Sequence, residues 1–203
     1  MKSVLISIQP YWVFLIIAKT MGWGIDQEKT VEVRKNFPKD LDWNKKAIIY
    51  CSKSKQSFNR IPKKYQPLMQ KFLGKVIGEF VCDRVHNIKL EEEFETGASF
   101  WNCGYYADED CLSMEEFESY LKKGFGYGWH ISNLVIYDKP KKLREFNTFC
   151  KEWDKYNPNC DGCKYFINCK GYEYDESDCS CDGLKPIERP PQSWCYVRNW
   201  GCQ

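Results

Sequence analysis

The sequence predicts an α+β fold, a small β-barrel of five to six strands with flanking helices and a cysteine-rich insertion. Five or six short apolar segments alternate with few helical ones, a pattern typical of a barrel with appended helices. Six cysteines fall between positions 149 and 184, where aliphatic residues are almost absent. The length of 203 residues suits one such domain with an insertion.

The first apolar run predicts a strand and a helix rather than a signal peptide. Lys2 and the apolar residues up to Ala18 resemble a signal sequence, but Gln9 and Pro10 divide the run. Residues 4–8 have the character of a buried strand, and Pro10 fits the first turn of a helix. No other segment approaches the length of a membrane span. We therefore expect a cytoplasmic protein with no membrane partner, whose twelve cysteines are reduced thiols or metal ligands.

Further elements follow from periodicity and from capping signals. Strands are expected at 30–34, 47–51, 75–85, 131–137 and 192–197. Gly78 inside the strand 75–85 indicates a bulge or a close backbone approach. Ser113 and Glu116 have capping-box spacing and open a helix at 113–123, which Gly124 ends. A short helix is expected from Asp138 to Phe146.

Charge is distributed unevenly, although the net charge is only +2. Between Trp43 and Gly78 there are nine lysines and arginines and no acid, whereas residues 79–118 contain twelve acids. If the basic stretch 43–78 clusters in space, it gives the fold a basic face that attracts phosphates. The alternative is a solvated loop whose lysines serve solubility.

The strand at 30–34 carries a polar constellation. Alternation places Val31 and Val33 on one face and Glu32 and Arg34 on the other, with Lys29 at the strand entrance. Arg34 can bind a phosphate or orient Glu32, and Glu32 can accept a hydrogen bond from a base amino group. The alternative is an Arg–Glu pair that only braces the strand.

Other candidate ligand residues lie at strand ends. Trp129 and His130 follow a glycine-flanked turn, where the indole can stack on a base and the imidazole can contact a phosphate or base edge. Core packing is the alternative for Trp129. Weaker candidates sit at the ends of strands near the expected cleft: Ser7, Gln9, Tyr50, Gln192 and Trp194.

The cysteine-rich segment predicts a structural zinc site. Cys160 and Cys163 have the spacing of a zinc knuckle, and Cys179 with Cys181 supplies a second close pair. Cys150 and Cys169 are further candidate ligands, and disulfides are the alternative. The segment cannot bury a core alone, so we expect three parts: the main barrel at 1–148, the insertion at 149–184, and a closing strand at 185–203.

Several motifs together resemble ASCH-domain proteins of the PUA-like superfamily, of the type carried by phages and prophages. These are the segments 3–10, 28–35, 75–80, 127–132 and 189–196. The most specific is the Lys-x-x-Glu-x-Arg string at Lys29, Glu32 and Arg34, although Gln27 stands where the family usually has glycine. The resemblance implies a PUA-like barrel whose cleft binds RNA, a nucleotide or a modified nucleoside in a phage or prophage accessory protein.

The resemblance leaves two other functions open. Some relatives are amidohydrolases of acetylcytidine that use a lysine, a threonine and a glutamate, and others are metal-dependent ribonucleases. Lys29 matches the lysine, but Glu32 stands at the position of the threonine nucleophile. A hydrolase would use Lys29 or Glu32 as acid–base groups. The third function is a protein-interaction module whose insertion contacts a host protein.

Overall fold

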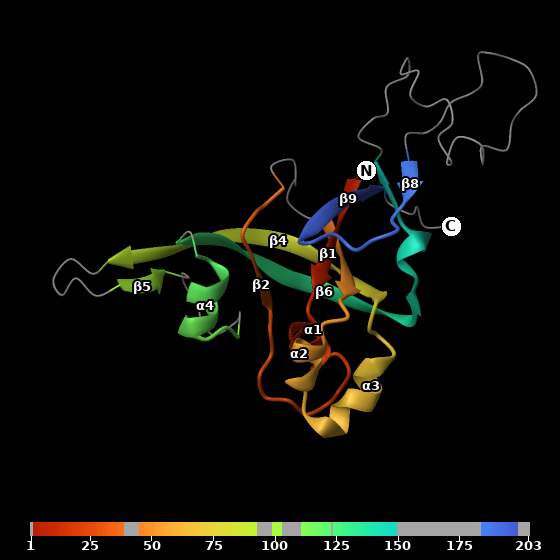
Figure 1. Cartoon of the computed structure of the whole chain (residues 1–203), viewed down its shortest axis with the longest axis horizontal. Coiled ribbons are helices and arrows are strands. Elements are labelled where there is room, and N and C mark those ends of the chain that lie inside the picture. The colour runs from red at the N-terminus through yellow and green to blue at the C-terminus, as the bar shows by residue number, and fades with distance from the viewer. Residues whose placement is uncertain are drawn as a thin grey trace, which may run out of the picture.

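A computed structural model describes residues 2–38, 45–92, 99–102, 111–122, 124–149 and 184–198. Seven described strands form one mixed sheet: six follow the order β2-β6-β4-β3-β1-β9, and the seventh, β5, pairs with β4 (Figure 1). They are β1 (Lys2–Ile8), β2 (Val31–Arg34), β3 (Lys45–Cys51), β4 (Lys75–Glu92), β5 (Ser99–Asn102), β6 (Phe125–Lys141) and β9 (Trp194–Arg198). Among the ladders of this sheet that the described residues form, only β1 and β3 pair in parallel, and the others are antiparallel. The predicted α+β class is confirmed.

The helices are short and lie at one end and one side of the sheet. They are α1 (Pro10–Ile17), α2 (Lys55–Asn59), the 3-10 turn η1 (Lys63–Tyr65), α3 (Gln66–Gln70) and α4 (Met114–Tyr120). In Figure 1, α1, α2 and α3 lie below the strands, and α4 lies beside β2. The predicted capping box of α4 is present, with Ser113 and Glu116 as its two members. Pro10 occupies the first turn of α1, as predicted.

The core lies on both faces of the central strands. In β1, Ile6 and Ile8 pack against α1 residues such as Phe14, whereas Leu5 packs with Val197 on the other face. A strand that is buried on both faces has a continuous run of apolar residues in its sequence. This is why the sequence predicts β1 and β3.

The basic stretch folds instead of forming a plain loop. It takes in β3 and continues through α2, η1 and α3 to the start of β4. Between β3 and β4, four buried apolar residues anchor it to the core: Ile61, Tyr65, Met69 and Phe72. The side chains of its lysines at 53, 55, 63, 64 and 71 are exposed. The stretch is therefore a packed helical lobe with a cationic surface.

Both predicted boundaries of β6 were wrong, and β4 runs to Glu92 instead of ending at residue 85. The glycine-rich segment that precedes residue 131 belongs to the strand, because these glycines allow close packing rather than a turn. A Cβ at Gly128 would lie 2.1 Å from Cε1 of His86, and one at Gly126 would lie 2.7 Å from Cδ2 of Leu121. At its other end β6 runs to Lys141, which leaves only the 3-10 turn η3 (Leu143–Glu145) of the expected helix.

The expected irregularity at Gly78 is confirmed. The ladder between β4 and β6 shifts register between Val76 and Gly78. A Cβ at Gly78 would lie 2.3 Å from the carbonyl oxygen of Val135, so the backbones approach too closely for a side chain.

A separate two-stranded ladder joins β7 (Asn147–Phe149) to β8 (Leu184–Pro186). It brings together the two ends of the segment 150–183, which lies outside the described residues together with all six of its cysteines: Cys150, Cys160, Cys163, Cys169, Cys179 and Cys181. The zinc site and the three-part division therefore stay predictions.

We expect Cys51 and Cys82 to be unreactive in the native protein. Both side chains are buried, and burial raises the pKa of each thiol to about 12, with the Asp83 charge adding to the effect at Cys82. Since the thiolate is the nucleophile, iodoacetamide at about pH 8 should label both positions only after unfolding in urea. Peptide mass spectrometry measures the labelling, and equal labelling rates with and without urea would contradict the prediction.

Candidate functional site

One pocket of about 780 Å³ opens between β2, the chain following β1 and β3, helix α4 and the loop before β9. Three of its lining residues are the predicted Lys29, Glu32 and Arg34, and it also takes in Ser7, Gln9 and Gln192. The volume falls within the range of roughly 300–1,000 Å³ typical of small-molecule sites.

The floor of the pocket is a buried charged trio. Lys29, Glu32 and Arg34 are only 2%, 5% and 4% exposed. The Nζ atom of Lys29 lies 3.8 Å from Oε2 of Glu32, and Nη2 of Arg34 lies 3.0 Å from Oε1. Two cations therefore share one carboxylate. Buried charges are tolerated when they are paired and hydrogen-bonded in this way.

Arg34 also joins the two ends of the strand order. Its Nη2 donates to the carbonyl oxygen of Ser7 at 2.7 Å, and its Nη1 donates to that of Ser193 at 3.5 Å. Ser7 lies in β1 and Ser193 immediately precedes β9, whereas Arg34 belongs to β2 at the other end of the sheet. These hydrogen bonds orient Glu32 and connect the two ends of the strand order. The guanidinium therefore makes structural hydrogen bonds and is not arranged to bind a phosphate with two parallel hydrogen bonds.

Trp12 and Arg60 add an aromatic and cationic wall that sequence reasoning did not identify. The guanidinium of Arg60 lies 4.0 Å from the ring centroid of Tyr11 and 4.8 Å from that of Trp12. The Nζ atom of Lys29 is 5.2 Å from the same Trp12 ring. Cations over aromatic faces are stabilised by the ring quadrupole. The basic stretch had indicated the charge of Arg60, but not its position in the pocket.

Helix α4 forms another part of the pocket wall and is linked to Arg60. One carboxylate oxygen of Glu116 accepts from the backbone N–H of Ser113 at 3.0 Å and so caps the helix. The other oxygen lies 2.7 Å from Nη1 of Arg60. Further along, burial raises the pKa of Tyr120, while the charge of nearby Arg34 acts against this shift and that of Glu32 adds to it. The Tyr120 hydroxyl therefore stays protonated and can donate to a ligand.

Two buried side-chain polar atoms of the pocket residues make no hydrogen bond within the described part of the chain. They are Nε of Arg34 and Oγ of Ser52. A buried polar atom without a partner costs about 1–3 kcal/mol, which a polar ligand would recover.

Four predicted residues do not line the pocket. Trp129 is 0% exposed and packs edge-on against Phe37 in the core. Core packing was the alternative that the sequence left open for this residue. Tyr50 is buried in the core on the other face of the sheet. Trp194 packs against the main core and against Tyr196. His130 lies on β6 beside Asp83, with 2.5 Å between Nδ1 and Oδ1.

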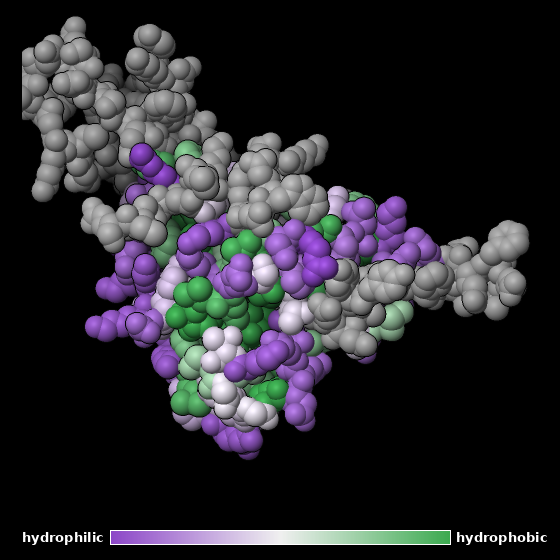
Figure 2. All heavy atoms as spheres, turned by 180° about the vertical axis from the view of Figure 1, so that it is seen from behind, coloured by the Kyte–Doolittle hydropathy of each residue, from purple (hydrophilic) through white to green (hydrophobic). Residues whose placement is uncertain are grey.

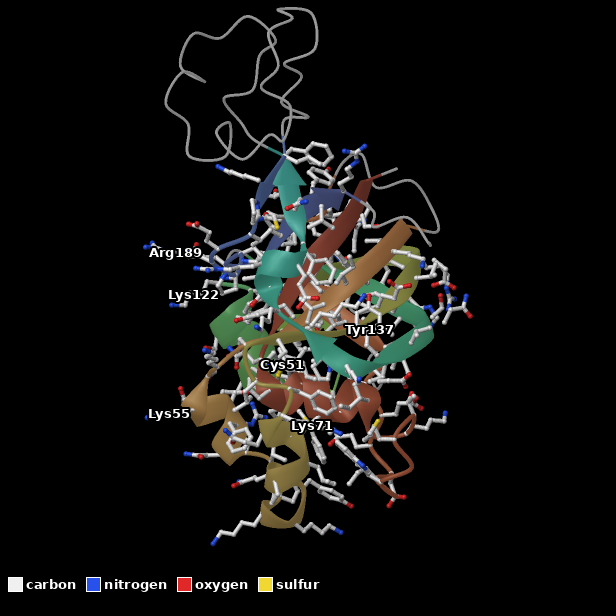
Figure 3. The ribbon with its side chains drawn as sticks, turned by 90° about the vertical axis from the view of Figure 1, so that its right-hand side faces the viewer. Cys51, Lys55, Lys71, Lys122, Tyr137 and Arg189 are labelled. Atoms are coloured by element: carbon white, nitrogen blue, oxygen red, sulfur yellow. The ribbon has the colours of Figure 1, made fainter. Side chains whose placement is uncertain are left out.

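Cationic side chains stand near the pocket on one side of the molecule. Lys55 follows the lining residue Ser54, Arg189 precedes Pro190, and Lys122 comes two residues after Tyr120. All three lie along one edge of the view in Figure 3. By contrast, the face in Figure 2, which is the back of Figure 1, has hydrophobic residues gathered at its centre. The charges at the edge favour the approach of phosphate groups.

In the ranges that the structure describes, no group of three His, Cys, Asp or Glu residues is placed to hold a metal ion. Within the same ranges, no helix has the length and apolar character that a bilayer crossing requires.

We expect Glu32→Gln to destabilise the fold by about 3 kcal/mol, because it leaves two buried cations without their counter-charge. Urea unfolding followed by circular dichroism measures the loss. Glu115→Gln is the matched control, since Glu115 lines the same pocket but is exposed, and should change stability by less than about 0.5 kcal/mol. Equal effects of the two substitutions would show that the buried trio is not a stabilising unit.

No protein-family model matches the chain, and no curated protein matches its sequence. Solved structures to which it is similar include three of the ASCH protein from Zymomonas mobilis. A serine-to-alanine variant of that protein is 15% identical with a TM-score of 0.49, over 97% of this chain and 88% of that one. The unsubstituted protein is 16% identical with a TM-score of 0.44, over 70% of this chain and 73% of that one. A tyrosine-to-phenylalanine variant is 16% identical with a TM-score of 0.45, over 70% and 77%.

Proposed function

We propose that the chain is an ASCH-type protein that binds a nucleotide unit, free or as part of RNA, in the pocket above Lys29, Glu32 and Arg34. The observation that carries the proposal is the buried trio together with the unpartnered Nε of Arg34 and Oγ of Ser52. A site of this kind offers donors and an acceptor at fixed positions, which is what recognition of a base edge requires.

The floor matches the polar groups of a nucleobase. Glu32 can accept from an exocyclic amino group, while Lys29 and Arg34 can donate to a neighbouring carbonyl or ring nitrogen. Trp12 supplies an aromatic surface at the pocket wall on which a base can stack. An amino group beside an acceptor atom occurs on cytosine, adenine and guanine edges, so these bases fit the floor better than uracil does.

Phosphates fit the side of the pocket that carries Arg60. This guanidinium is partly exposed, lines the pocket and is held by Glu116. A phosphate can draw it away from this carboxylate, and Lys55 and Arg189 lie close in sequence to other lining residues. Attraction by several cations at the edge would bring a polyanion to the floor.

Binding is better supported than hydrolysis. Glu32 stands where related amidohydrolases carry their nucleophile, and cations engage both of its oxygens. A carboxylate held in this way serves as a hydrogen-bond acceptor and is poorly placed to attack or to take a proton. A role in a phage or prophage is part of the same proposal and rests on the sequence motifs.

Fluorescence polarisation with a labelled mixed-sequence RNA oligonucleotide tests the proposal. We expect affinity to fall roughly 20-fold between about 50 and 200 mM salt, as for about three phosphate contacts on a single strand. Arg60→Gln should weaken binding and reduce the slope of log affinity against log salt by about 0.7. Ser52→Ala should weaken binding without changing that slope, because a hydroxyl releases no counterion.

The control is Lys139→Gln, which removes an exposed cation that does not line the pocket. Binding that is independent of salt, or parent-like binding by both pocket variants, would rule the proposal out. Mass spectrometry of the RNA, and of acetylcytidine incubated with the protein, reports any turnover in parallel.

We also propose one structural zinc ion on Cys160, Cys163, Cys179 and Cys181, on the strength of their spacing. Native mass spectrometry of freshly purified protein should show the added mass of one zinc ion. Replacing both Cys160 and Cys163 by serine should remove it, whereas replacing Cys111, which lies outside the segment, should not. Retention of zinc by the double variant would contradict this assignment.

A further inference from the structure

A β-bulge outside the pocket brings an acid, a base and a guanidinium together. Along the β4–β6 ladder, Cys82 pairs with Ile131 and Val85 pairs with Trp129, with a register shift between them. Two residues of β4, Asp83 and Arg84, therefore stand opposite the single residue His130. Bulges of this kind re-aim side chains and are frequent beside functional sites.

The two ring nitrogens of His130 have different partners. Nδ1 donates to the Asp83 carboxylate at 2.5 Å, which fixes the ring. On the other side of the ring, Nη2 of Arg84 lies 3.3 Å from Nε2. The side chains of His130 and Asp83 are 19% and 35% exposed, and Arg84 is exposed, so solvent reaches the group. None of the three lines the pocket.

We propose that His130 and Arg84 form a second binding site for a phosphate group, with Asp83 as the positioning residue. A phosphate oxygen that approaches the Nε2 edge of the ring accepts from Nη2 of Arg84, and from Nε2 of His130 in the imidazolium form. The Asp83 carboxylate compensates for the added charge on the ring. The site takes an inorganic phosphate, a phosphomonoester or a phosphodiester of a nucleic acid strand.

The charges of Asp83, Arg84 and His130 favour binding of an anion over binding of a metal ion. A guanidinium directed at Nε2 repels a cation from the nitrogen that would ligate it, whereas it adds a donor for an oxyanion. Burial acts to raise the pKa of Asp83, but the hydrogen bond and charge of His130 outweigh burial and hold it below its ordinary value. Asp83 is thus ionised at neutral pH.

The chain has only two histidines, which makes a direct test possible. Imidazole resonances of the labelled full-length chain are recorded by NMR at about pH 6, within the range in which histidine side chains change charge in proteins. Sodium phosphate is added at constant ionic strength, balanced with chloride. We expect the His130 signal to shift saturably, whereas His86, whose ring packs on Gly128, keeps its position. His130→Gln assigns the two signals.

Arg84→Gln should weaken the phosphate response roughly tenfold, as expected for the loss of one charged hydrogen bond. Asp83→Asn should weaken it as well, whereas Lys139→Gln should leave it unchanged. A second titration with dimethyl phosphate tells whether the site accepts phosphodiesters. A response that matches that to phosphate assigns the site to phosphodiesters. No response assigns it to free phosphate or phosphomonoesters. Amide spectra verify that each variant is folded.

A His130 signal that does not respond, that shifts without saturating, or that responds equally in Arg84→Gln overturns the inference. Arg60→Gln, which affects the pocket, should respond to phosphate as the parent does. Failure at the bulge is therefore distinguishable from failure of the proposed pocket function.

Discussion

The arrangement of the pocket depends on one buried guanidinium. Strand β2 has only four residues and pairs with β6 along one edge. On its other side, Arg34 supplies hydrogen bonds to the backbone at Ser7 and Ser193, near the far end of the strand order. The same guanidinium fixes Glu32, whose second oxygen faces Lys29. Holding the sheet edges together and orienting the polar floor are therefore two consequences of one side chain.

Local patterns predicted the elements whose signals lie within a few residues. The apolar runs of β1 and β3, Pro10 at the start of α1 and the Ser113–Glu116 capping box all belong to this class. The outer halves of β4 and β6 have no such pattern in the sequence, because these segments form strands largely through pairing with each other. The glycines at 126 and 128 look like a turn in the sequence, and only the neighbouring Leu121 and His86 explain them as close contacts.

The residues of the candidate site also differ in whether a local sequence pattern predicts them. Alternation along one strand was enough to place Glu32 and Arg34 together, since neighbours two residues apart share a face. Trp12, Ser52 and Arg60 reach the pocket from three other segments, and no spacing in the sequence connects them. Trp129 shows the converse difficulty: an aromatic residue after glycine fits a stacking surface and a core position equally well until its neighbours are known.

The position of the pocket at the junction of the sheet edges links ligand binding to the integrity of the fold. Lys29, Glu32 and Arg34 come from β2 and its approach, whereas Ser7, Ser52 and Gln192 come from segments at the other end of the strand order. A ligand that accepts from Nε of Arg34 and from Oγ of Ser52 would connect these two groups of segments directly. Because the unfolded chain has no such arrangement, ligand binding would favour the folded state.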